Sequence, residues 1–262
     1  MILPIGDENP TRRFPLVTVT LIAINVIVYF AFESPLEGNE LTCFIYRWAA
    51  VPRELLSFKT LPPGSVPDAS CPITVFADKN VLVSAITSMF LHGSLLHLLF
   101  NMLFLWIFGN NVEDRLGHVG YLLYYLAGGI VSVYAFALVN ANLITPLLGA
   151  SGAIAAVLGG YLLMFPRARV HTYVPFPLYL FAFLVPGAVI RGFFFFFAVI
   201  DLPSWLVLGF WFLTQITAVN EAARTGVAYE AHIAGFVAGL IFTLLLGDRG
   251  RRPPMRQAVA WP

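Results

Sequence analysis

The chain has 262 residues, of which 59% are hydrophobic and only 11% are charged, and its formal net charge is +1. A typical soluble domain carries about 25% charged residues, so the composition excludes an ordinary soluble protein. The near-neutral charge also gives no basic stripe of the kind that binds nucleic acid. Because the apolar residues form runs of about 20, the length of a membrane-spanning helix, we expect an all-α polytopic membrane protein.

Six apolar runs are expected to cross the bilayer as one membrane domain, residues 14–247. The first run follows a polar segment, residues 1–13, and is too long for the core of a signal peptide, so it is expected to be retained. Arginines gather at one side of the runs, which places both termini, including the tail 248–262, in the cytoplasm of what we expect to be a bacterial inner membrane. The expected spans are Phe14–Phe32, Gly93–Val112, Val119–Val139, Leu148–Phe165, Phe193–Val219 and Ala231–Leu246.

A long outer loop, about residues 34–92, is expected after the first span. It holds both cysteines of the chain, Cys43 and Cys71. Since this side of the membrane would be oxidising, a Cys43–Cys71 disulfide is one hypothesis and two unpaired thiols are the other. The run Val81–Phe108 is too long for one upright helix, so Val81–Leu91 is expected to lie at the outer interface.

The segment between the fourth and fifth spans has an unusual composition. Tyr173–Ile190 contains Pro175, Pro177 and Pro186 within an apolar stretch. Only one further span fits before residue 220 if the tail is to stay inside. We therefore expect Tyr173–Ile190 to be a proline-broken segment at the inner surface.

Four polar side chains lie inside the apolar runs, where they are costly and mark functional sites. Counted from the cytoplasmic arginines at 1.5 Å per residue, His97, Ser151 and His232 stand about 27, 24 and 26 Å above the inner surface. They therefore share one layer in the outer half of the membrane. Asn101 lies on the same helix face as His97, one turn deeper. A serine and a histidine that meet there are the parts of a nucleophile and its base.

Each of these residues also has an interpretation without chemistry. Serine packs well between membrane helices, so Ser151 needs no chemistry beside the small-residue seam of Gly152, Ala156 and Gly160. Gly235 and Gly239 likewise form a GxxxG packing motif. His232 could simply bond a neighbouring helix or relay protons. Considered together, the small residues are expected to bring the fourth and sixth helices close enough for the serine and the histidine to touch.

The sequence resembles a known family, the rhomboid intramembrane serine proteases, over about residues 12–247. The resemblance implies a bundle of six transmembrane helices with a long outer loop after the first. The motifs that carry it are His92-x4-His97-x3-Asn101, Glu113-x-Arg115-Leu116-Gly117, Gly149-x-Ser151-Gly152 and Ala231-His232-x-x-Gly235-x-x-x-Gly239.

The resemblance implies a catalytic dyad. Ser151 would attack a peptide carbonyl, with His232 as general base and then as acid to the leaving amine. The developing oxyanion needs donors already in place, and His97, Asn101 and the backbone N–H of Ser151 match the family's oxyanion site. His92 is either an accessory donor or a wet interfacial histidine.

Other positions carry no chemistry or depart from the family pattern. Glu113 and Arg115 resemble the structural turn that ties inner helix ends together. Ala155 stands where some members have a tyrosine stacked on the catalytic histidine, so what orients that histidine is open. Ile86-Thr87-Ser88 stands where some members have a Trp-Arg pair.

Three functional hypotheses compete. The first is an active protease that cuts transmembrane proteins near the outer face, with the bilayer itself as its environment, no cofactor and no indicated soluble or nucleic-acid partner. The second is an inactive relative that binds membrane clients, and the third is a transporter with a histidine relay, which predicts inverted repeats that are not evident. No metal site is expected, since an HExxH pattern and a cysteine cluster are both missing. Candidate residues for lateral entry are Phe210, Trp211 and Phe212, for which lipid-facing or interfacial packing is the alternative.

Overall fold

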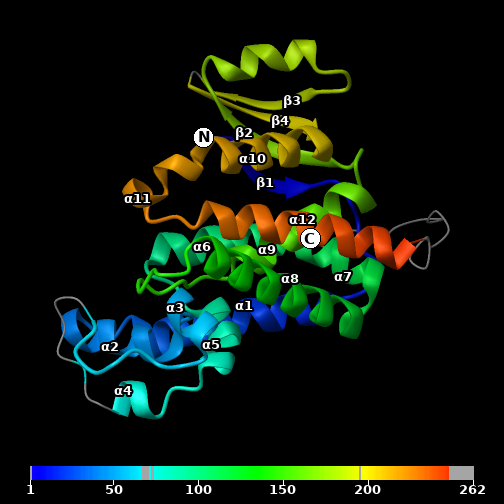
Figure 1. The fold of residues 1–262 in the computed structure, drawn as a ribbon. Helices are drawn as coiled ribbons and strands as arrows, with labels where there is room; N and C mark the ends of the chain where they lie inside the picture. Colours follow the sequence, from blue (N-terminus) through cyan, green and yellow to red (C-terminus); the bar gives the residue numbers. More distant parts are fainter. Residues whose placement is uncertain (1, 67–70, 72–73, 195, 248–262) are drawn as a thin grey trace.

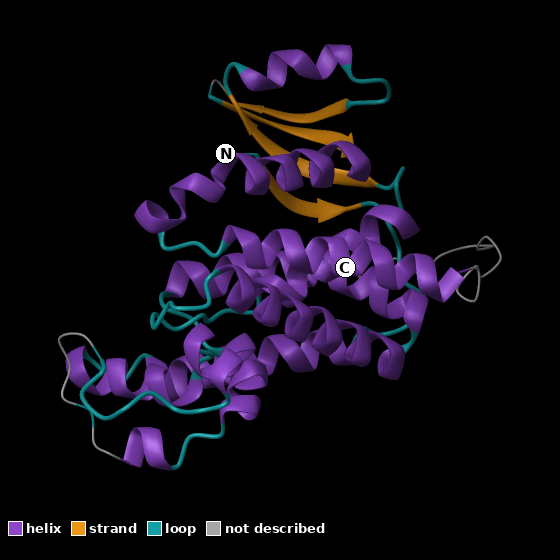
Figure 2. Ribbon diagram, in the orientation of Figure 1, coloured by secondary structure: helices purple, strands orange, loops and turns teal. Residues whose placement is uncertain are grey.

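A computed structural model describes residues 2–66, 71, 74–194 and 196–247. It consists of a helical bundle with a sheet at one side and a group of short helices at another (Figures 1 and 2). The expected tail, 248–262, lies outside the described residues. The α-helices of five or more residues are α1 (Leu16–Val28), α2 (Gly38–Trp48), α3 (Pro52–Ser57), α5 (Val81–Thr87), α6 (Leu95–Phe104), α7 (Asn110–Leu116), α8 (His118–Val139), α9 (Ser151–Met164), α10 (Ser204–Ala218) and α12 (Tyr229–Leu246).

Shorter or tighter helical pieces connect these elements. Two π-helical turns continue α1 and α6, and four-residue helices and 3₁₀ turns lie in the connections. They are η1 (Tyr29–Glu33), α4 (Thr74–Ala77), η2 (Ser88–Phe90), η3 (Leu105–Gly109), η4 (Leu178–Leu184), η5 (Val219–Glu221) and α11 (Ala222–Thr225).

Four helices of the described chain are long and apolar enough to cross a membrane, so the protein is an integral membrane protein. These are Leu16–Glu33, Leu95–Leu116, His118–Val139 and Tyr229–Leu246. The helices α9 and α10 have 14 and 15 residues, or about 21 and 22 Å at the helical rise. Both are shorter than the about 30 Å of hydrocarbon that a full span crosses.

Helix α9 lies at the centre of the bundle. Every residue from Gly152 to Tyr161 is buried, as expected for a helix that is apolar on all sides. Its closest neighbour is α12, because neither Gly235 nor Gly239 has a side chain to hold the two backbones apart. A Cβ on Gly239 would lie 2.7 Å from the carbonyl carbon of Ala156 and closer still to its oxygen. The two helices therefore touch backbone to backbone.

Tyr124 of α8 joins the same two helices. Its hydroxyl donates to the carbonyl oxygen of Gly239 (2.7 Å) and lies 3.2 Å from that of Ala156 and 3.0 Å from Oγ1 of Thr243. One buried group thus contacts α9 and α12 from a third helix. The core of the bundle is held by close packing and by hydrogen bonds that apolar surroundings favour.

Glu113 of α7 fixes the start of α1. Its carboxylate accepts hydrogen bonds from the backbone N–H groups of Val17 (2.8 Å) and Thr18 (2.7 Å) and from the Thr18 hydroxyl. His118 Nδ1 lies 2.5 Å from the same carboxylate. An anion at the unsatisfied N–H groups of a helix start is stabilising, so Glu113 ties two helix ends together. Arg115 is half-buried in the last turn of α7.

The segment 34–92 is not the plain loop expected from the sequence. It contains α2 to α5 and a separate small core around Tyr46, Val51 and Phe76. Cys43 and Cys71 are joined in a disulfide that staples this group of helices, which we call the cap (residues 34–92). The sequence missed its helices because they are short, so no long apolar period reveals them.

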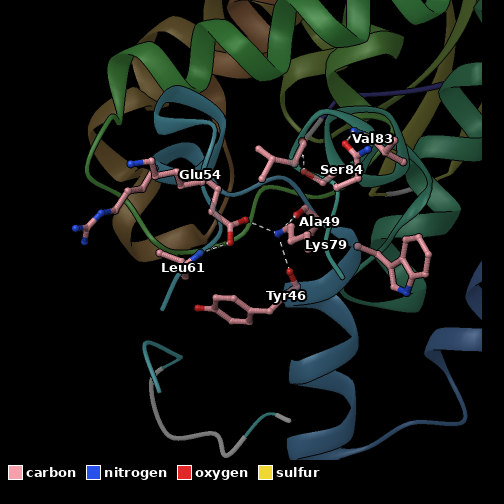
Figure 3. Close-up of polar contacts among 12 residues, drawn as sticks. Tyr46, Ala49, Glu54, Leu61, Lys79, Val83 and Ser84 are labelled. Atoms are coloured by element: carbon pink, nitrogen blue, oxygen red, sulfur yellow. Dashed lines mark hydrogen bonds and ion pairs between the residues drawn. The ribbon is translucent and has the colours of Figure 1, made fainter. Parts of the chain in front are cut away.

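A buried ion pair lies within the cap (Figure 3). Lys79 and Glu54 meet at 2.5 Å with side chains only 1% exposed. The ammonium also donates to the carbonyl oxygens of Tyr46 (2.7 Å) and Ala49 (2.9 Å), and Glu54 accepts from the N–H of Leu61 (2.8 Å). Buried charges persist only when they are paired and hydrogen-bonded in this way.

The cap reaches the loop that precedes α9. Leu147 donates its N–H to the carbonyl oxygen of Ala50 (2.7 Å), and Gly149 donates to that of Ser88 (2.9 Å). The expected interfacial segment Val81–Leu91 consists of α5 and η2, with Met89 buried against the bundle core. The cap and the start of α9 are thus connected through backbone hydrogen bonds.

The all-α expectation is wrong, because the structure contains an antiparallel sheet of order β1-β2-β4-β3. One strand lies in the N-terminal segment expected to be simply polar. β2 and β3 flank the proline-broken segment, most of which lies between them and includes η4, and β3 and β4 occupy the first part of the expected fifth span, Phe193–Val219. The strands are β1 (Leu3–Asp7), β2 (Arg169–Pro175), β3 (Val189–Phe194) and β4 (Phe197–Pro203).

The physical reason lies in the period of the pattern. In β2 the residues Val170, Thr172 and Val174 are buried and alternate with less buried neighbours, which is the two-residue period of a strand. Pro175 and Pro203 end strands, where a missing N–H costs little. Length and mean hydropathy alone do not separate such strands from a membrane helix.

Candidate active site

Ser151 and His232 meet. Ser151 is the first residue of α9 and His232 lies in the first turn of α12, and both side chains are half-buried. The distance from His232 Nε2 to Ser151 Oγ is 2.8 Å, a hydrogen bond between residues 81 apart in sequence. The close approach of α9 and α12 accounts for it. A hydroxyl held against an imidazole is the arrangement that activates a nucleophile.

The other ring nitrogen of His232 contacts a residue that the sequence analysis missed. His232 Nδ1 lies 2.8 Å from Oε1 of Gln215 on α10. The sequence did carry a signal, because Gln215 is a strongly polar amide within a mostly apolar helix, and such residues in membrane helices mark hydrogen-bonded contacts. Ser132 of α8 was also missed, although it is likewise a polar residue within an apolar helix. Its hydroxyl donates to the carbonyl oxygen of Ala231 (2.7 Å), the residue before His232.

The loop before Ser151 brings His97 to the same place. Gly149 has a φ of +119°, which favours glycine. A Cβ there would lie 2.8 Å from Nε2 of His97 and 3.6 Å from Oγ of Ser151. The imidazole of His97 and the serine hydroxyl therefore flank the same bare glycine. The next glycine, Gly152, lets the side chain of Ser132 approach α9.

Asn101 is buried one turn below His97, with 7% of its surface exposed. Its Nδ2 is buried and has no hydrogen-bond partner among the residues that the structure describes. A buried amide N–H without a partner is costly and calls for an explanation. The first N–H groups of α9, including that of Ser151, also have no carbonyl from a preceding turn.

His92 is not the wet interfacial histidine that the sequence left as one alternative. It is 1% exposed, its ring lies 5.1 Å from that of His97, and its backbone N–H donates to Glu33 Oε2 (2.7 Å). Neither ring nitrogen has a partner within the described part of the chain. Burial, and the nearby His97, lower the pKa of His92 to about 3, so its ring is neutral at physiological pH.

Aromatic rings from α10 and α12 surround the histidine. The Trp211 ring lies 6.1 Å from that of His232, and Tyr229 meets the histidine edge-on at 6.3 Å. Phe212 stacks on Phe236 at 4.5 Å, whereas Phe210 is 44% exposed. Of the three residues considered for lateral entry, two therefore pack inward against α12.

Ala155 occupies the position at which some family members have a tyrosine. It is fully buried, and a Cβ added to Gly235 would lie 3.2 Å from its own Cβ. The close contact of α9 with α12 thus encloses the side chain of Ala155. The aromatic contacts to His232 come instead from Trp211 of α10 and Tyr229 of α12.

A small cavity of about 10 Å³ opens beside Ser151, about the space of one water molecule. Its walls come from η2, α8, α9, α12 and the loop before α9. The lining residues are Met89, Gly129, Ser132, Val133, Leu147, Gly149, Ser151, Gly152, Ala153 and Ala231.

One group of metal-ligating side chains occurs in the described chain, and it lies in the sheet. Glu8, His171 and Asp201 place ligand atoms within 4.8 Å of one another. Arg191 forms ion pairs with Glu8 and Asp201, and His171 lies 2.6 Å from Asp201. Because a guanidinium already compensates these carboxylates, the group forms a structural ion-pair network.

Comparisons with known proteins identify the family to which the chain is similar. A model of the rhomboid domain matches residues 79–249. The yeast (Saccharomyces cerevisiae) protein named rhomboid protein 1, mitochondrial, is 31% identical over 68% of this chain and 47% of its own length. A zebrafish (Danio rerio) presenilin-associated rhomboid-like protein A, mitochondrial, is 31% identical over 58% of this chain and 33% of its own. Rhomboid protease GlpG of Yersinia pseudotuberculosis is 28% identical over 58% of this chain and 44% of its own.

This chain thus spans less than half the length of each of these three relatives. The family model nevertheless covers well over half of this chain, including every helix that contributes to the Ser151–His232 contact. On these grounds, the protein belongs to the rhomboid family.

Proposed function

We propose that this protein is an intramembrane serine endopeptidase that hydrolyses peptide bonds of transmembrane proteins near the outer membrane face. The observation that carries the proposal is the 2.8 Å hydrogen bond between Ser151 Oγ and His232 Nε2. It is supported by the name of one relative, a rhomboid protease. An inactive, client-binding protein does not need a serine and a histidine held at this distance.

The chemistry follows from this pair. Ser151 Oγ attacks the peptide carbonyl carbon while its proton passes to His232 Nε2, which gives a tetrahedral oxyanion. The imidazolium then returns that proton to the departing amine as the C–N bond breaks, leaving an ester on Ser151. A water molecule, deprotonated by the same imidazole, hydrolyses the ester and frees the enzyme.

Three donors fit the oxyanion. Asn101 Nδ2 is buried without a partner, the N–H of Ser151 is the first of its helix, and His97 flanks Gly149 beside the serine. Such donors stabilise charge that develops in the transition state and are worth about 10²- to 10³-fold in rate each. His92, buried behind His97, is assigned a supporting position rather than direct contact.

The membrane arrangement is part of the proposal. Six crossings are assigned, with α9 and α10 as the two short ones and both termini in the cytoplasm. The Cys43–Cys71 disulfide agrees with a cap on the oxidising side. A bacterial inner membrane stays a prediction, since two of the named relatives are mitochondrial.

The substrates proposed are transmembrane helices with small or helix-breaking residues at the cleaved bond. The bond must leave its helix to reach Ser151, and the cavity that adjoins Ser151 is small, about 10 Å³, which favours small side chains at the cleaved bond. Entry past α10 is proposed, with exposed Phe210 on its path.

Cleavage of a reporter tests the proposal. The full chain, reconstituted in vesicles, is mixed with a doubly tagged single-span protein that carries small residues near its outer end. The parent and a control, Thr217→Val at an exposed position of α10, are expected to cut it, whereas Ser151→Ala is expected to bind without cutting. Equal cleavage by Ser151→Ala would refute the assignment, and binding without cleavage by the parent would favour the client-binding alternative.

A further inference from the structure

Gln215 is a buried amide whose surroundings fix its orientation. It is 8% exposed and lies on α10 among apolar residues. Its Nε2 donates to the carbonyl oxygen of Trp211 (3.2 Å) and to Oγ1 of Thr214 (3.1 Å). A reversed amide would set its oxygen against the Trp211 carbonyl oxygen, acceptor against acceptor. The oxygen Oε1 therefore faces His232.

This orientation determines the tautomer of the histidine. An amide oxygen only accepts, so the 2.8 Å contact from Gln215 Oε1 requires the proton to be on His232 Nδ1. The neutral ring then has its lone pair on Nε2, the atom that lies 2.8 Å from Ser151 Oγ. The serine is consequently the donor in that bond, as a nucleophile must be when its base is about to take its proton.

The same helix also limits the tilt of the imidazole. Trp211 lies four residues before Gln215, on the same face of α10, and its ring is inclined by 33° to that of His232. α10 thus supplies both a ring beside the imidazole and an acceptor for its Nδ1. The position filled by Ala155 supplies neither.

We propose that Gln215 is a positioning residue, a third member beside Ser151 and His232 that holds the imidazole in its productive tautomer and orientation. This inference rests on the proposed function. Unlike the aspartate of a serine-protease triad, the amide carries no charge. It therefore selects the tautomer without adding a full negative charge to stabilise the imidazolium.

Two substitutions separate this role from simple packing. Gln215→Leu keeps the size of the side chain and removes the acceptor. Gln215→Glu keeps an acceptor and adds a charge, which favours the protonated ring. Thr217→Val, an exposed position on the same helix, is the matched control. The titratable groups that the described residues place against His232 are His97 of α6 and Tyr229 of its own helix, and both are unchanged in every variant.

The experiment measures kcat and KM for the reporter, and the rate at which a fluorophosphonate labels Ser151, from pH 5 to 9 in vesicles. We expect Gln215→Leu to lower kcat by about 100-fold, the lower end of what a general base contributes, with KM within about twofold. Gln215→Glu is expected to retain activity at high pH and to raise the pH of half-maximal labelling by about one unit or more.

The possible outcomes are distinct. An inactive parent, or a Ser151→Ala variant as active as the parent, overturns the proposed function and this inference with it. An active parent with an unaltered pH profile in Gln215→Glu and an unaltered kcat in Gln215→Leu overturns this inference alone. If Gln215→Leu fails to fold, the pH profile of Gln215→Glu decides.

Discussion

Substitution of Gly239 by alanine should separate the two halves of the site without touching either. The added Cβ would lie 2.7 Å from the Ala156 carbonyl carbon, whereas ordinary contact begins near 3.4 Å. The Ala156 carbonyl carbon is backbone and the new Cβ is bonded directly to backbone, so neither atom can rotate away. The helices α9 and α12 must therefore separate by at least about 0.7 Å. Added to the 2.8 Å between Ser151 and His232, this reaches the outer limit of a hydrogen bond.

Two effects follow from that shift. Overpacking of a tight interior costs about 1–3 kcal/mol, so the midpoint of thermal unfolding should fall. A misplacement near 1 Å costs about 10²-fold in rate, so fluorophosphonate labelling of Ser151 should slow by about that factor. Gly209→Ala, on α10 with nothing within 4 Å of the added Cβ, is the matched control and should behave as the parent.

The assay compares the three proteins in the same detergent, with labelling rates and unfolding curves from one preparation. If Gly239→Ala labels and unfolds as the parent does, the backbone contact of α9 with α12 does not hold the serine and the histidine together, and the account of the site's geometry fails.

Three further predictions concern parts of the molecule outside the dyad. Replacing Cys43 and Cys71 together by serine should destabilise the cap by about 3–4 kcal/mol, the loop-closure value for their separation of 28 residues. Limited proteolysis of the variant should then cut the cap first, and a cleavage pattern equal to that of the parent would contradict this. Glu113→Ala removes the acceptor for the first turn of α1 and should cost about 1–3 kcal/mol in thermal unfolding, against no change if the contact is incidental. Burial raises the pKa of Asp7 from 3.8 to about 6, so the folded state binds more protons than the unfolded chain between these pH values. The free energy of unfolding should therefore fall as pH rises through this range. Asp7→Asn should flatten the fall, and an equally steep fall in the variant would exclude Asp7 as its cause.

The sequence predicted the centre of the site better than its surroundings. Ser151 and His232 could be predicted because polar residues are rare within membrane-spanning helices. The spacing of Gly235 and Gly239 also indicates a close helix pair. Counting residues from the arginines placed both side chains at one depth, and the structure has them in contact. The depth of each side chain follows from its own helix, and the glycine spacing of one helix indicates the close pair.

The sheet was missed for a physical reason. The strands β3 and β4 are rich in apolar residues and lie next to an apolar helix, and β1 pairs with β2 across more than 160 residues, a contact that no local pattern encodes. The prolines of Tyr173–Ile190 indicated a break but not a hairpin. The two-residue alternation in Arg169–Pro175 was the available signal, and it is short.

Gln215 shows a different limit. Its polarity within α10 could have been noticed, but its role depends on which face of α10 meets α12, and an apolar helix with polar residues on several faces does not specify that face. The packing of Trp211 and Phe212 on Phe236 settles the rotation of α10. Only then does the amide point at the histidine.

The most direct test of the Ser151–His232 pair is the site of a fluorophosphonate adduct, mapped by peptide mass spectrometry on the purified full chain. We expect a single adduct on Ser151 in the parent and in Thr217→Val, and its loss in His232→Ala. An adduct on another residue, or undiminished modification of Ser151 without His232, would contradict it.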